Sequence, residues 1–529
     1  MPRLPLTITL ARPEQDISVD LEVTFLAEDD ARPAEHLFGT DNAASTDSDS
    51  ALRVIRAAAA ALGARVLGGA GAVHVLGGVP LRAVVGLGKR AEITLDGLRR
   101  GAAQAIACAT DLHRASLAIS LPADVCASIA SDVAVQVVAE GALLAAHART
   151  PRATLTPKLD AARPPTRCVL RVPSAERAPP SAAQHASLRR AEAHAAATLL
   201  ARELADMPAN RLAPVELAER AAQAVEPLGV ASEVLTTAQL ERLGAGLLLA
   251  VGAGSARPPA LGVLRYAPPH AAYHVAVVGK GVTFDAGGIN VKPAKGMGDM
   301  VHDKAGAAAA AGIILGATLL QLPIALTALL ACAENLPSGA AYRPGDVLLG
   351  MDGATVEVVD TDAEGRLVLA DALTYAVRLA EPRPADAIVD LATLTGSIVS
   401  ALGNEAAGLF ANDDGLAARM LEAASAAGEA LWRMPILAGH RAQLKSERAD
   451  RKQCAERGGD CAIAAAFLEM YVDQRPWLHL DIAGVAYNEG SPEWPPYHPK
   501  SGASGAGVRT VLHFLESLSI APPAGTAGP

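Results

Sequence analysis

The second half of the chain alternates short apolar runs with longer stretches rich in Ala and Leu. A short apolar run bounded by turn residues is typical of a buried strand, and the Ala- and Leu-rich stretches predict helices. Strands that alternate with helices form a largely parallel sheet covered on both faces. In such folds the functional residues lie at the carboxyl ends of the strands. The clearest predicted strands are 274–278, 324–330, 356–359, 387–391 and 478–482.

The first 170 residues show a second strand and helix pattern, without a catalytic motif. Residues 28–50 are acidic and rich in turn residues, which predicts a long loop. We therefore predict an α/β fold with two domains, in which the C-terminal one has a largely parallel or mixed central sheet flanked by helices. The predicted parts are an N-terminal α/β domain (1–175), a linker and connecting helix (176–206), the catalytic domain (207–520) and a disordered tail (521–529).

One uncharged run, residues 305–332, is long enough to span a bilayer. Pro323 interrupts it beside Gln321, so a buried helix (303–320) followed by a buried strand (324–333) explains the run better. The N-terminus has a short apolar run followed by charges, which is not the pattern of a signal peptide. We therefore expect a cytoplasmic protein without a membrane segment.

The composition indicates a folded protein with reduced cysteines. Hydrophobic residues make up 51% of the 529 residues, which excludes disorder of the whole chain. The net charge of −10 argues against a general binder of nucleic acids or anionic membranes. The six cysteines show no CxxC pair and no regular spacing, so we expect free thiols.

The distribution of lysine singles out residues 280–304. The chain has 9 lysines and 37 arginines, yet Lys280, Lys292, Lys295 and Lys304 all fall in this segment. A lysine can lose its proton and act as an amine ligand, an acid or a base, whereas an arginine effectively cannot. Chance or solvation of a loop is the alternative explanation.

The same segment carries two carboxylates in suggestive places. The predicted strand ends at Gly279, and Asp285 follows in the expected loop, next to two glycines that let the backbone approach a bound group. Asp303 precedes the Ala-rich helix, where it could simply be the N-cap. These positions predict a site in which lysines and carboxylates lie together.

A second segment, DTDAEGR at 360–366, places Asp360, Asp362 and Glu364 at the end of a strand. Residues two apart on an extended segment face the same side, so Asp362 and Glu364 would repel each other unless cations lie between them. A solvated acidic turn is the alternative. The arrangement favours a site for cations.

Taken together, the two segments predict a dinuclear metal site. Two divalent cations about 3.5–4 Å apart can share a bridging hydroxide, which is a nucleophile at neutral pH. Lys280 could complete the ligand set as a neutral amine, while Lys292 and Arg366 would bind anions. The four carboxylates that would balance two such cations are Asp285, Asp303, Asp362 and Glu364.

These segments resemble the signatures of the leucine aminopeptidase family of dinuclear metallo-exopeptidases. VGKGVTFDAGGINVKP is similar to the family's lysine–aspartate–lysine segment, and DTDAEGRLVLADAL is similar to its NTDAEGR signature. The intervals between the candidate ligands also agree. The resemblance covers about residues 190–516 and implies an aminopeptidase that releases N-terminal amino acids, with Leu-like residues preferred.

The resemblance implies a role for each matching position. Asp285 and Glu364 would bridge two ions, Mn²⁺ or Zn²⁺ with Mg²⁺ possible, and the free amino terminus of the peptide would bind the more exchangeable one. The tighter metal would be bound by Lys280, Asp285, Asp303 and Glu364, and the exchangeable metal by Asp285, Asp362 and Glu364.

The same resemblance implies the catalytic and substrate-binding groups. Lys292 would stabilise the oxyanion formed when a metal-bridging hydroxide attacks, and Arg366 would anchor a bicarbonate ion that acts as general base. The backbone around Leu394 would bind this anion and the main chain of the substrate. The pocket for the first side chain would be lined by Met300, Thr393, Gly396 and Ala483.

Four positions depart from the family pattern, and one of them is Ala486, where some relatives carry a bulky residue that lines the pocket, so a wider pocket is a hypothesis. Lys304 follows a ligand where the family has an uncharged residue, and Asp206 and Asp360 stand where asparagine is usual. Asp360 adds a negative charge near the substrate and could favour a basic first residue. His302 is a weak candidate ligand, and His479 is expected to be a buried, hydrogen-bonded histidine.

The family also implies the partners, namely peptide substrates and other copies of the chain in a homohexamer. A dinuclear phosphoesterase is a second enzyme reading, but Lys280 as a ligand argues against it. The remaining alternative is a hexameric DNA-binding or regulatory relative with weak or altered peptidase activity. The net charge of −10 makes nucleic acid an unfavourable partner.

Overall fold

The computed structural model describes ten ranges of the chain, which fall into two compact units. The N-terminal unit contains residues 3–195 and 490–500, and the C-terminal unit contains residues 1–2, 196–489 and 501–529. The loop expected at 28–50 and the tail expected at 521–529 lie outside the described residues. The described ranges are 4–12, 15, 17–27, 69–77, 80–121, 129–149, 163–173, 178–455, 458–491 and 494–520.

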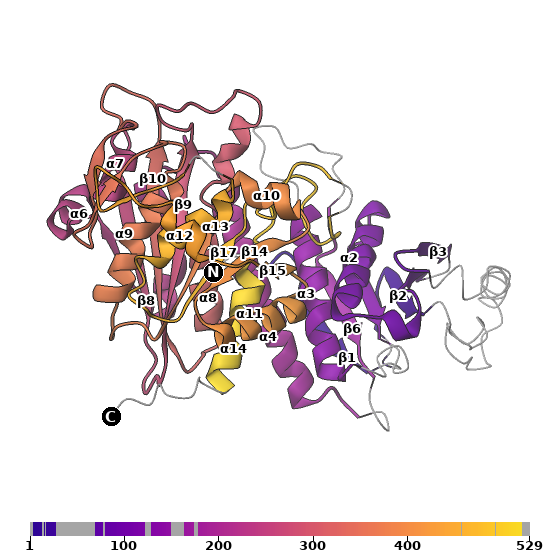
Figure 1. The fold of residues 1–529 in the computed structure, drawn as a ribbon. Coiled ribbons are helices and arrows are strands. Elements are labelled where there is room, and N and C mark those ends of the chain that lie inside the picture. Colours follow the sequence, from indigo (N-terminus) through magenta and orange to yellow (C-terminus); the bar gives the residue numbers. More distant parts are fainter. Residues whose placement is uncertain are drawn as a thin grey trace, which may run out of the picture. The chain divides into compact units, whose positions relative to one another are not determined.

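The N-terminal unit is a six-stranded sheet with helices, drawn in indigo and purple in Figure 1. The strand order is β1-β6-β5-β2-β4-β3, and every pairing is parallel except that of β3 with β4. The strands are β1 (Thr7–Ala11), β2 (Leu21–Leu26), β3 (Val73–Gly77), β4 (Leu81–Gly86), β5 (Ser116–Ser120) and β6 (Arg167–Arg171). The helices are η2 (Arg90–Glu92), α2 (Leu95–Asp111), α3 (Ser131–Arg149) and the first part of α4 (Ala182–Asp206).

The C-terminal unit contains a mixed sheet of eight strands in the order β15-β14-β17-β13-β9-β10-β8-β7. The four central strands β17, β13, β9 and β10 run parallel, so their carboxyl ends lie at one edge. The strands are β7 (Ala231–Leu235), β8 (Ala260–Tyr266), β9 (His274–Asp285), β10 (Ala325–Asn335), β13 (Ala387–Ala392), β14 (Ala407–Ala411), β15 (Leu431–Arg433) and β17 (Trp477–Asp481). Two small sheets contain β11 (Val347–Leu349), β12 (Thr355–Glu357) and β16 (Arg451–Lys452), and β18 (Tyr487–Asn488) with β19 (Gly502–Ala503).

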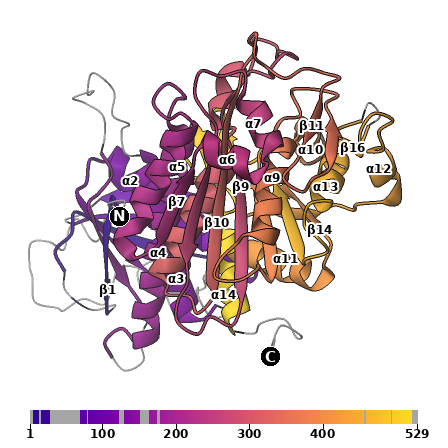
Figure 2. The ribbon, with the colours of Figure 1, turned by 90° about the vertical axis from the view of Figure 1, so that its left-hand side faces the viewer.

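Helices cover both faces of the large sheet, as Figures 1 and 2 show. One face packs against α4, α5, α8, α11 and α14, and the other against α7, α9, α10 and α13. The helices of this unit are α5 (Pro214–Val225), η4 (Glu226–Leu228), α6 (Thr237–Leu243), α7 (Gly246–Gly252), η5 (Met297–His302), α8 (Ala305–Leu319), α9 (Gly365–Arg378), α10 (Gly396–Leu402), α11 (Asp414–Ala427), α12 (Ala438–Ala442), α13 (Asp460–Glu469) and α14 (Val508–Ile520). The predicted α/β fold with a mixed central sheet is confirmed.

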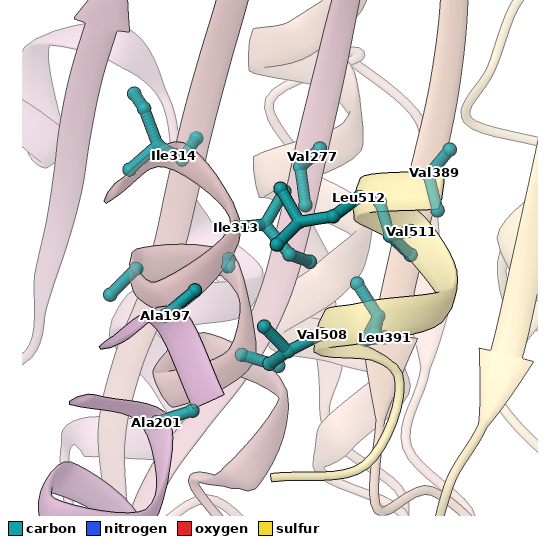
Figure 3. Packing of buried hydrophobic residues seen from close by; sticks show 14 of the residues in the cluster. Ala197, Ala201, Val277, Ile313, Ile314, Val389, Leu391, Val508, Val511 and Leu512 are labelled. Carbon is teal, nitrogen blue, oxygen red and sulfur yellow. The ribbon is translucent and has the colours of Figure 1, made fainter. Parts of the chain in front are cut away.

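The uncharged run at 305–332 forms the buried helix α8 and most of the buried strand β10. Figure 3 shows Ile313 of α8 packed beside Val511 and Leu512 of α14, next to the central strands. Small residues also permit close packing of α8 against α4, because a Cβ on Gly312 would lie 2.4 Å from the backbone oxygen of Ala197. Among the described residues no helix is both long and apolar enough to cross a membrane.

The prediction that the strand ends at Gly279 is wrong. β9 continues to Asp285, because residues 280–285 extend the ladder with β10, where Lys280 lies beside Ala331 and Asp285 beside Asn335. Lys280 therefore lies inside a strand and not in a loop. This rigid backbone fixes two candidate ligands on one strand.

Candidate active site

Three buried carboxylates meet at the carboxyl edge of the parallel strands. Asp285 ends β9, Asp303 lies between η5 and α8, and Glu364 directly precedes α9. Each offers an oxygen, and these oxygens lie within 4.8 Å of one another. Asp303 is not the N-cap of α8, because Lys304 occupies that position and the Asp303 carboxylate faces Lys280. The alternative of a simple helix cap for Asp303 is therefore wrong.

The Lys280 ammonium lies among three acceptors. Its Nζ is 2.7 Å from Asp303 Oδ1, 2.8 Å from Glu364 Oε1 and 2.8 Å from the backbone oxygen of Thr393. Burial alone would lower the pKa of Lys280, but the surrounding carboxylates outweigh it and raise the pKa above its usual range. The two segments that the sequence singled out are therefore in direct contact.

Lys292 joins the other two carboxylates. Its Nζ lies 2.8 Å from Asp285 Oδ2 and 2.6 Å from Asp362 Oδ1. Burial opposes the charge here too, yet Asp285 and Glu364 raise the pKa of Lys292 above its ordinary value. Lys292 is thus an ammonium group at neutral pH in this structure, and it forms ion pairs with two carboxylates at the edge of the site.

The negative charge of the buried carboxylates is only partly balanced by the neighbouring lysines Lys280 and Lys292. Burial and the neighbouring Asp285 raise the pKa of Glu364, and burial raises the pKa of Asp303 despite Lys280. Asp303 Oδ2 and Glu364 Oε2 are buried and have no hydrogen-bond partner among the described residues. Buried oxygens without partners are costly unless they bind a cation. An oxygen-rich set with one amine suits a hard divalent ion such as Mn²⁺ or Mg²⁺.

Neutral groups that the sequence did not reveal orient Asp285. The fully buried Asn335 donates from Nδ2 to Asp285 Oδ1 at 2.8 Å and to the backbone oxygen of Thr361 at 3.0 Å. Gly287 N also donates to Asp285 Oδ1 at 2.9 Å, and Tyr342 donates to the Thr361 oxygen. Asn335 thereby links the two segments that carry the ligands. Its only signal in the sequence is its place at the end of a buried strand.

A cavity of about 210 Å³ opens beside these charged groups. Several of its lining residues have apolar side chains. The lining includes all five predicted metal ligands, namely Lys280, Asp285, Asp303, Asp362 and Glu364, together with Lys292 and the predicted pocket residues Met300, Thr393, Leu394, Gly396 and Ala483. It also includes residues that the sequence did not single out for the substrate, namely Asp299, His302, Thr395, Val399 and Tyr487.

Two predicted site residues are not among those that line the cavity. Arg366 donates from Nη1 to the backbone oxygen of Gln453 at 3.0 Å and from Nη2 to Asp460 Oδ1 at 2.9 Å. The carboxylate of Asp360 accepts the backbone N–H of Asp362 at 2.9 Å. Asp360 therefore stabilises the turn that presents Asp362 and does not face the substrate cavity.

Two of the departures from the family pattern, Lys304 and Asp206, lie in one cluster behind the cavity. Lys304 is fully buried and donates to the backbone oxygen of Val301. Burial lowers the pKa of Lys304 to about 8, although the charge of Asp206 opposes this shift. Asp206 Oδ1 also lies 3.1 Å from Nε2 of His302, whose ring stacks on Tyr487. His302 lines the cavity, and it does not belong to the group of candidate metal ligands formed by Asp285, Asp303 and Glu364.

His479 is fully buried, with Nδ1 2.5 Å from Asp390 Oδ1, as expected for a buried, hydrogen-bonded histidine. The five cysteines that the structure describes are buried and free. They are Cys108, Cys168, Cys332, Cys454 and Cys461.

Comparisons with known proteins agree along most of the chain. The family model described as the cytosol aminopeptidase family, catalytic domain, matches residues 199–512, and the N-terminal domain of the same family matches residues 64–150. A probable cytosol aminopeptidase of Syntrophotalea carbinolica is 43% identical, covering 82% of this chain and 85% of the relative. A probable cytosol aminopeptidase of Roseiflexus castenholzii is 42% identical, and the match covers 85% of this chain and 90% of that relative.

A solved structure is also similar. The bottromycin maturation enzyme BotP in complex with Mn superposes with a TM-score of 0.78 at 33% sequence identity, covering 95% of this chain and 100% of that one.

Proposed function

Because the chain belongs to the cytosol aminopeptidase family and is a metal-dependent peptide hydrolase of that kind, we propose that it releases Leu-like amino acids from the N-termini of peptides. The observation that carries the proposal is one cavity whose lining combines buried carboxylates and two lysines with apolar side chains. The carboxylates suit cations, the apolar side chains suit an aliphatic first residue, and Lys292 suits a developing negative charge.

The residues present fit two divalent metal ions. The buried oxygens Asp303 Oδ2 and Glu364 Oε2 lack hydrogen-bond partners among the described residues, as atoms reserved for a cation would. We propose that Lys280, as a neutral amine whose proton is released when the cation binds, would hold one ion together with Asp285, Asp303 and Glu364, and that Asp285, Asp362 and Glu364 would hold the other. When bound, the ions would activate water and polarise the peptide carbonyl. Mn²⁺, Zn²⁺ and Mg²⁺ are the candidates.

Lys292 is the group that we assign to the oxyanion. Its ammonium lines the cavity and reaches the carboxylates of Asp285 and Asp362, so it lies at the border between the metal ligands and the substrate space. A preorganised cation that faces a developing oxyanion is worth about 10²–10³-fold in rate. Its raised pKa keeps the proton on Nζ at neutral pH.

The first side chain of the substrate would contact Met300, Leu394, Val399 and Ala483. All four line the cavity and have apolar side chains. Burying a Leu side chain there would contribute about 1.5–3 kcal/mol, which favours aliphatic first residues. Asp360 does not line the cavity, so it gives no support for a basic first residue.

A bicarbonate ion on Arg366 fits this arrangement less well than the metals do. Two of the five N–H groups of Arg366 already donate to Gln453 and Asp460, and the buried Nε has no hydrogen-bond partner among the described residues. Arg366 is also not among the residues that line the cavity, so we derive no step through the anion. Stimulation of the rate by added bicarbonate, lost in Arg366→Ala, is the test of this part of the proposal.

The proposal also includes assembly into a homohexamer in the cytoplasm, which rests on the family resemblance. Sedimentation velocity of the purified chain tests the assembly. A species of six chains at micromolar concentration is the expected result, and a monomer would contradict it.

The decisive experiment measures hydrolysis of aminoacyl anilides of Leu, Met, Arg, Lys and Asp by dialysed protein, with Mn²⁺, Zn²⁺ or Mg²⁺ restored. We expect metal-dependent release, fastest for Leu and Met. Lys292→Ala should lose about 10²–10³-fold in kcat. Lys295→Ala is the matched control, because Lys295 is exposed in the same loop and is not among the lining residues. Equal activity in both variants would refute the role of Lys292.

A further inference from the structure

Two loops that follow neighbouring parallel strands form part of the wall of the cavity. Residues 393–396 follow β13, and residues 482–485 follow β17. The strands pair in parallel register, with Ala392 beside Asp481. Leu394, Thr395 and Gly396 line the cavity from the first loop, and Ala483 lines it from the second. The shape of this wall therefore depends on how the two loops are joined.

Asp481, the last residue of β17, joins them. Its Oδ1 accepts the backbone N–H of Leu394 at 3.1 Å and that of Ala483 at 3.3 Å. Its Oδ2 accepts the hydroxyl of Thr395 at 2.6 Å. The side chain is fully buried and is not among the residues that line the cavity. One carboxylate thus holds both loops from behind.

The chemistry of the three partners suits a carboxylate. All three donate, so both oxygens of Asp481 act as acceptors, and hydrogen bonds to a charged acceptor are the stronger kind. The hydroxyl of Thr395 also accepts the N–H of Ile398 at 3.2 Å and so caps α10. Asp481 therefore fixes the start of this helix as well as the loop before it.

Three further buried side chains hold the strand that carries Asp481. Asp390 on β13 accepts from Trp477 Nε1 at 2.6 Å and contacts His479 Nδ1 at 2.5 Å, both on β17. These contacts also join β13 to β17, and on β17 they involve residues that precede Asp481. The end of β17 is thereby held at the end of β13.

We propose that Asp481 is a positioning residue that sets the spacing between Leu394 and Ala483 and thereby the discrimination among first side chains. This inference rests on the proposed function, because it concerns the pocket of that same site. Asp481 touches no substrate atom and acts only through the loops. The residues of a binding site must be held within about 0.5 Å of their working positions. Loss of the hydrogen bonds from Asp481 should therefore reduce the shape complementarity between the pocket and a Leu side chain.

The size of the effect follows from what a hydrophobic pocket can discriminate. One methylene group in such a pocket changes kcat/KM by about 10–200-fold. If the two loops can move apart, the enzyme should lose much of this selectivity. The loss in kcat/KM should be larger for the longer Leu side chain than for Ala. We expect the ratio of kcat/KM for Leu-anilide over Ala-anilide to fall about tenfold in Asp481→Ala.

The test compares this ratio in Asp481→Ala and Asp481→Asn with Asp371→Ala as the matched control. Asp371 is also buried, and its carboxylate accepts the N–H groups of Leu247, Leu248 and Met351, each at 2.9 Å. None of these three lines the cavity. A ratio of rate constants does not depend on the amount of folded enzyme, so general destabilisation leaves it unchanged.

The conservative variant separates placement from charge. The amide oxygen of Asp481→Asn can still accept from Leu394 and Ala483, and its NH₂ can donate to the Thr395 hydroxyl. We therefore expect Asp481→Asn to retain most of the selectivity. A ratio as low as that of Asp481→Ala would overturn the positioning role, and so would an unchanged ratio in Asp481→Ala or an equal fall in Asp371→Ala.

If Asp481→Ala does not fold, Thr395→Val and Thr395→Ser replace it. Valine keeps the shape of threonine but removes the hydroxyl that donates to Asp481, whereas serine keeps the hydroxyl. We expect the ratio to be lower in the valine variant than in the serine variant, and equal ratios in the two variants would overturn the inference. Wild-type protein that cleaves neither anilide would overturn the proposed function and this inference with it. An active Asp481→Ala with an unchanged ratio overturns the inference alone.

Discussion

Substitution of Asn335 by alanine should weaken metal binding without unfolding the protein. Asn335 is fully buried and donates one hydrogen bond to Asp285 and one to the backbone of Thr361. A bond to a charged group contributes about 1.5–3 kcal/mol and a neutral one about 1 kcal/mol. Part of this energy orients Asp285, because loss of a group that hydrogen-bonds to a metal ligand lowers metal affinity about 10–100-fold. We expect the dissociation constant for Mn²⁺ to rise by that factor.

Isothermal titration of dialysed protein with Mn²⁺ measures this change, and thermal unfolding shows that the variant is folded. Asn412→Ala is the control, since Asn412 also bonds to main-chain groups, of Trp477 and Arg475, but does not line the cavity. Its affinity for Mn²⁺ should equal that of the wild type. Unchanged affinity in a folded Asn335→Ala would refute the reasoning, because Asp285 would then need no support from the end of β10.

Three further predictions concern packing, pH and metal. Gly306→Ala should lower the free energy of unfolding by about 3 kcal/mol in urea denaturation, because its Cβ would lie 2.1 Å from the backbone oxygen of Leu391, whereas Gly439→Ala meets no atom within 4 Å and should change little. Burial disfavours the charged form of His479, but Asp390 outweighs it and raises the pKa of His479 above 6.5. The protonated histidine therefore stabilises the folded state below pH 6.5, and wild-type stability should decline as the pH rises above that value. His479→Asn should flatten this decline, and a parallel pH profile would contradict the prediction. Mn²⁺ at one hundred times its dissociation constant should add about 2.7 kcal/mol to the free energy of unfolding, and an unchanged melting temperature would argue against binding to the folded protein.

The sequence predicted which charged groups lie together, because the candidate ligands are closely spaced along the chain. Lys280, Asp285 and Asp303 fall within 24 residues, and the four candidate carboxylates near Lys280 and Lys292 have few stable arrangements without cations. The structure brings these groups into contact and places them around one cavity. The central strands were also predictable, since their apolar runs are long and bounded by turn residues.

Other features depend on tertiary contacts and could not be predicted from local pattern. Polar residues after Gly279 suggested a loop, but pairing with β10 extends the strand. Arg366 lies two residues after a ligand, yet the turn into α9 directs it toward Asp460 and away from the cavity. Asn335 and Asp481 act on backbone groups of neighbouring segments, and such partners leave no signature in sequence.

The measurement that tests the central claim most directly compares Leu-anilide with N-acetyl-Leu-anilide, using dialysed protein before and after Mn²⁺ or Zn²⁺ is restored. An aminopeptidase recognises the free amino group, so we expect metal-dependent release from the first substrate and none above background from the second. Equal cleavage of both substrates, or no cleavage of either by protein that binds two metal ions per chain, would contradict the account.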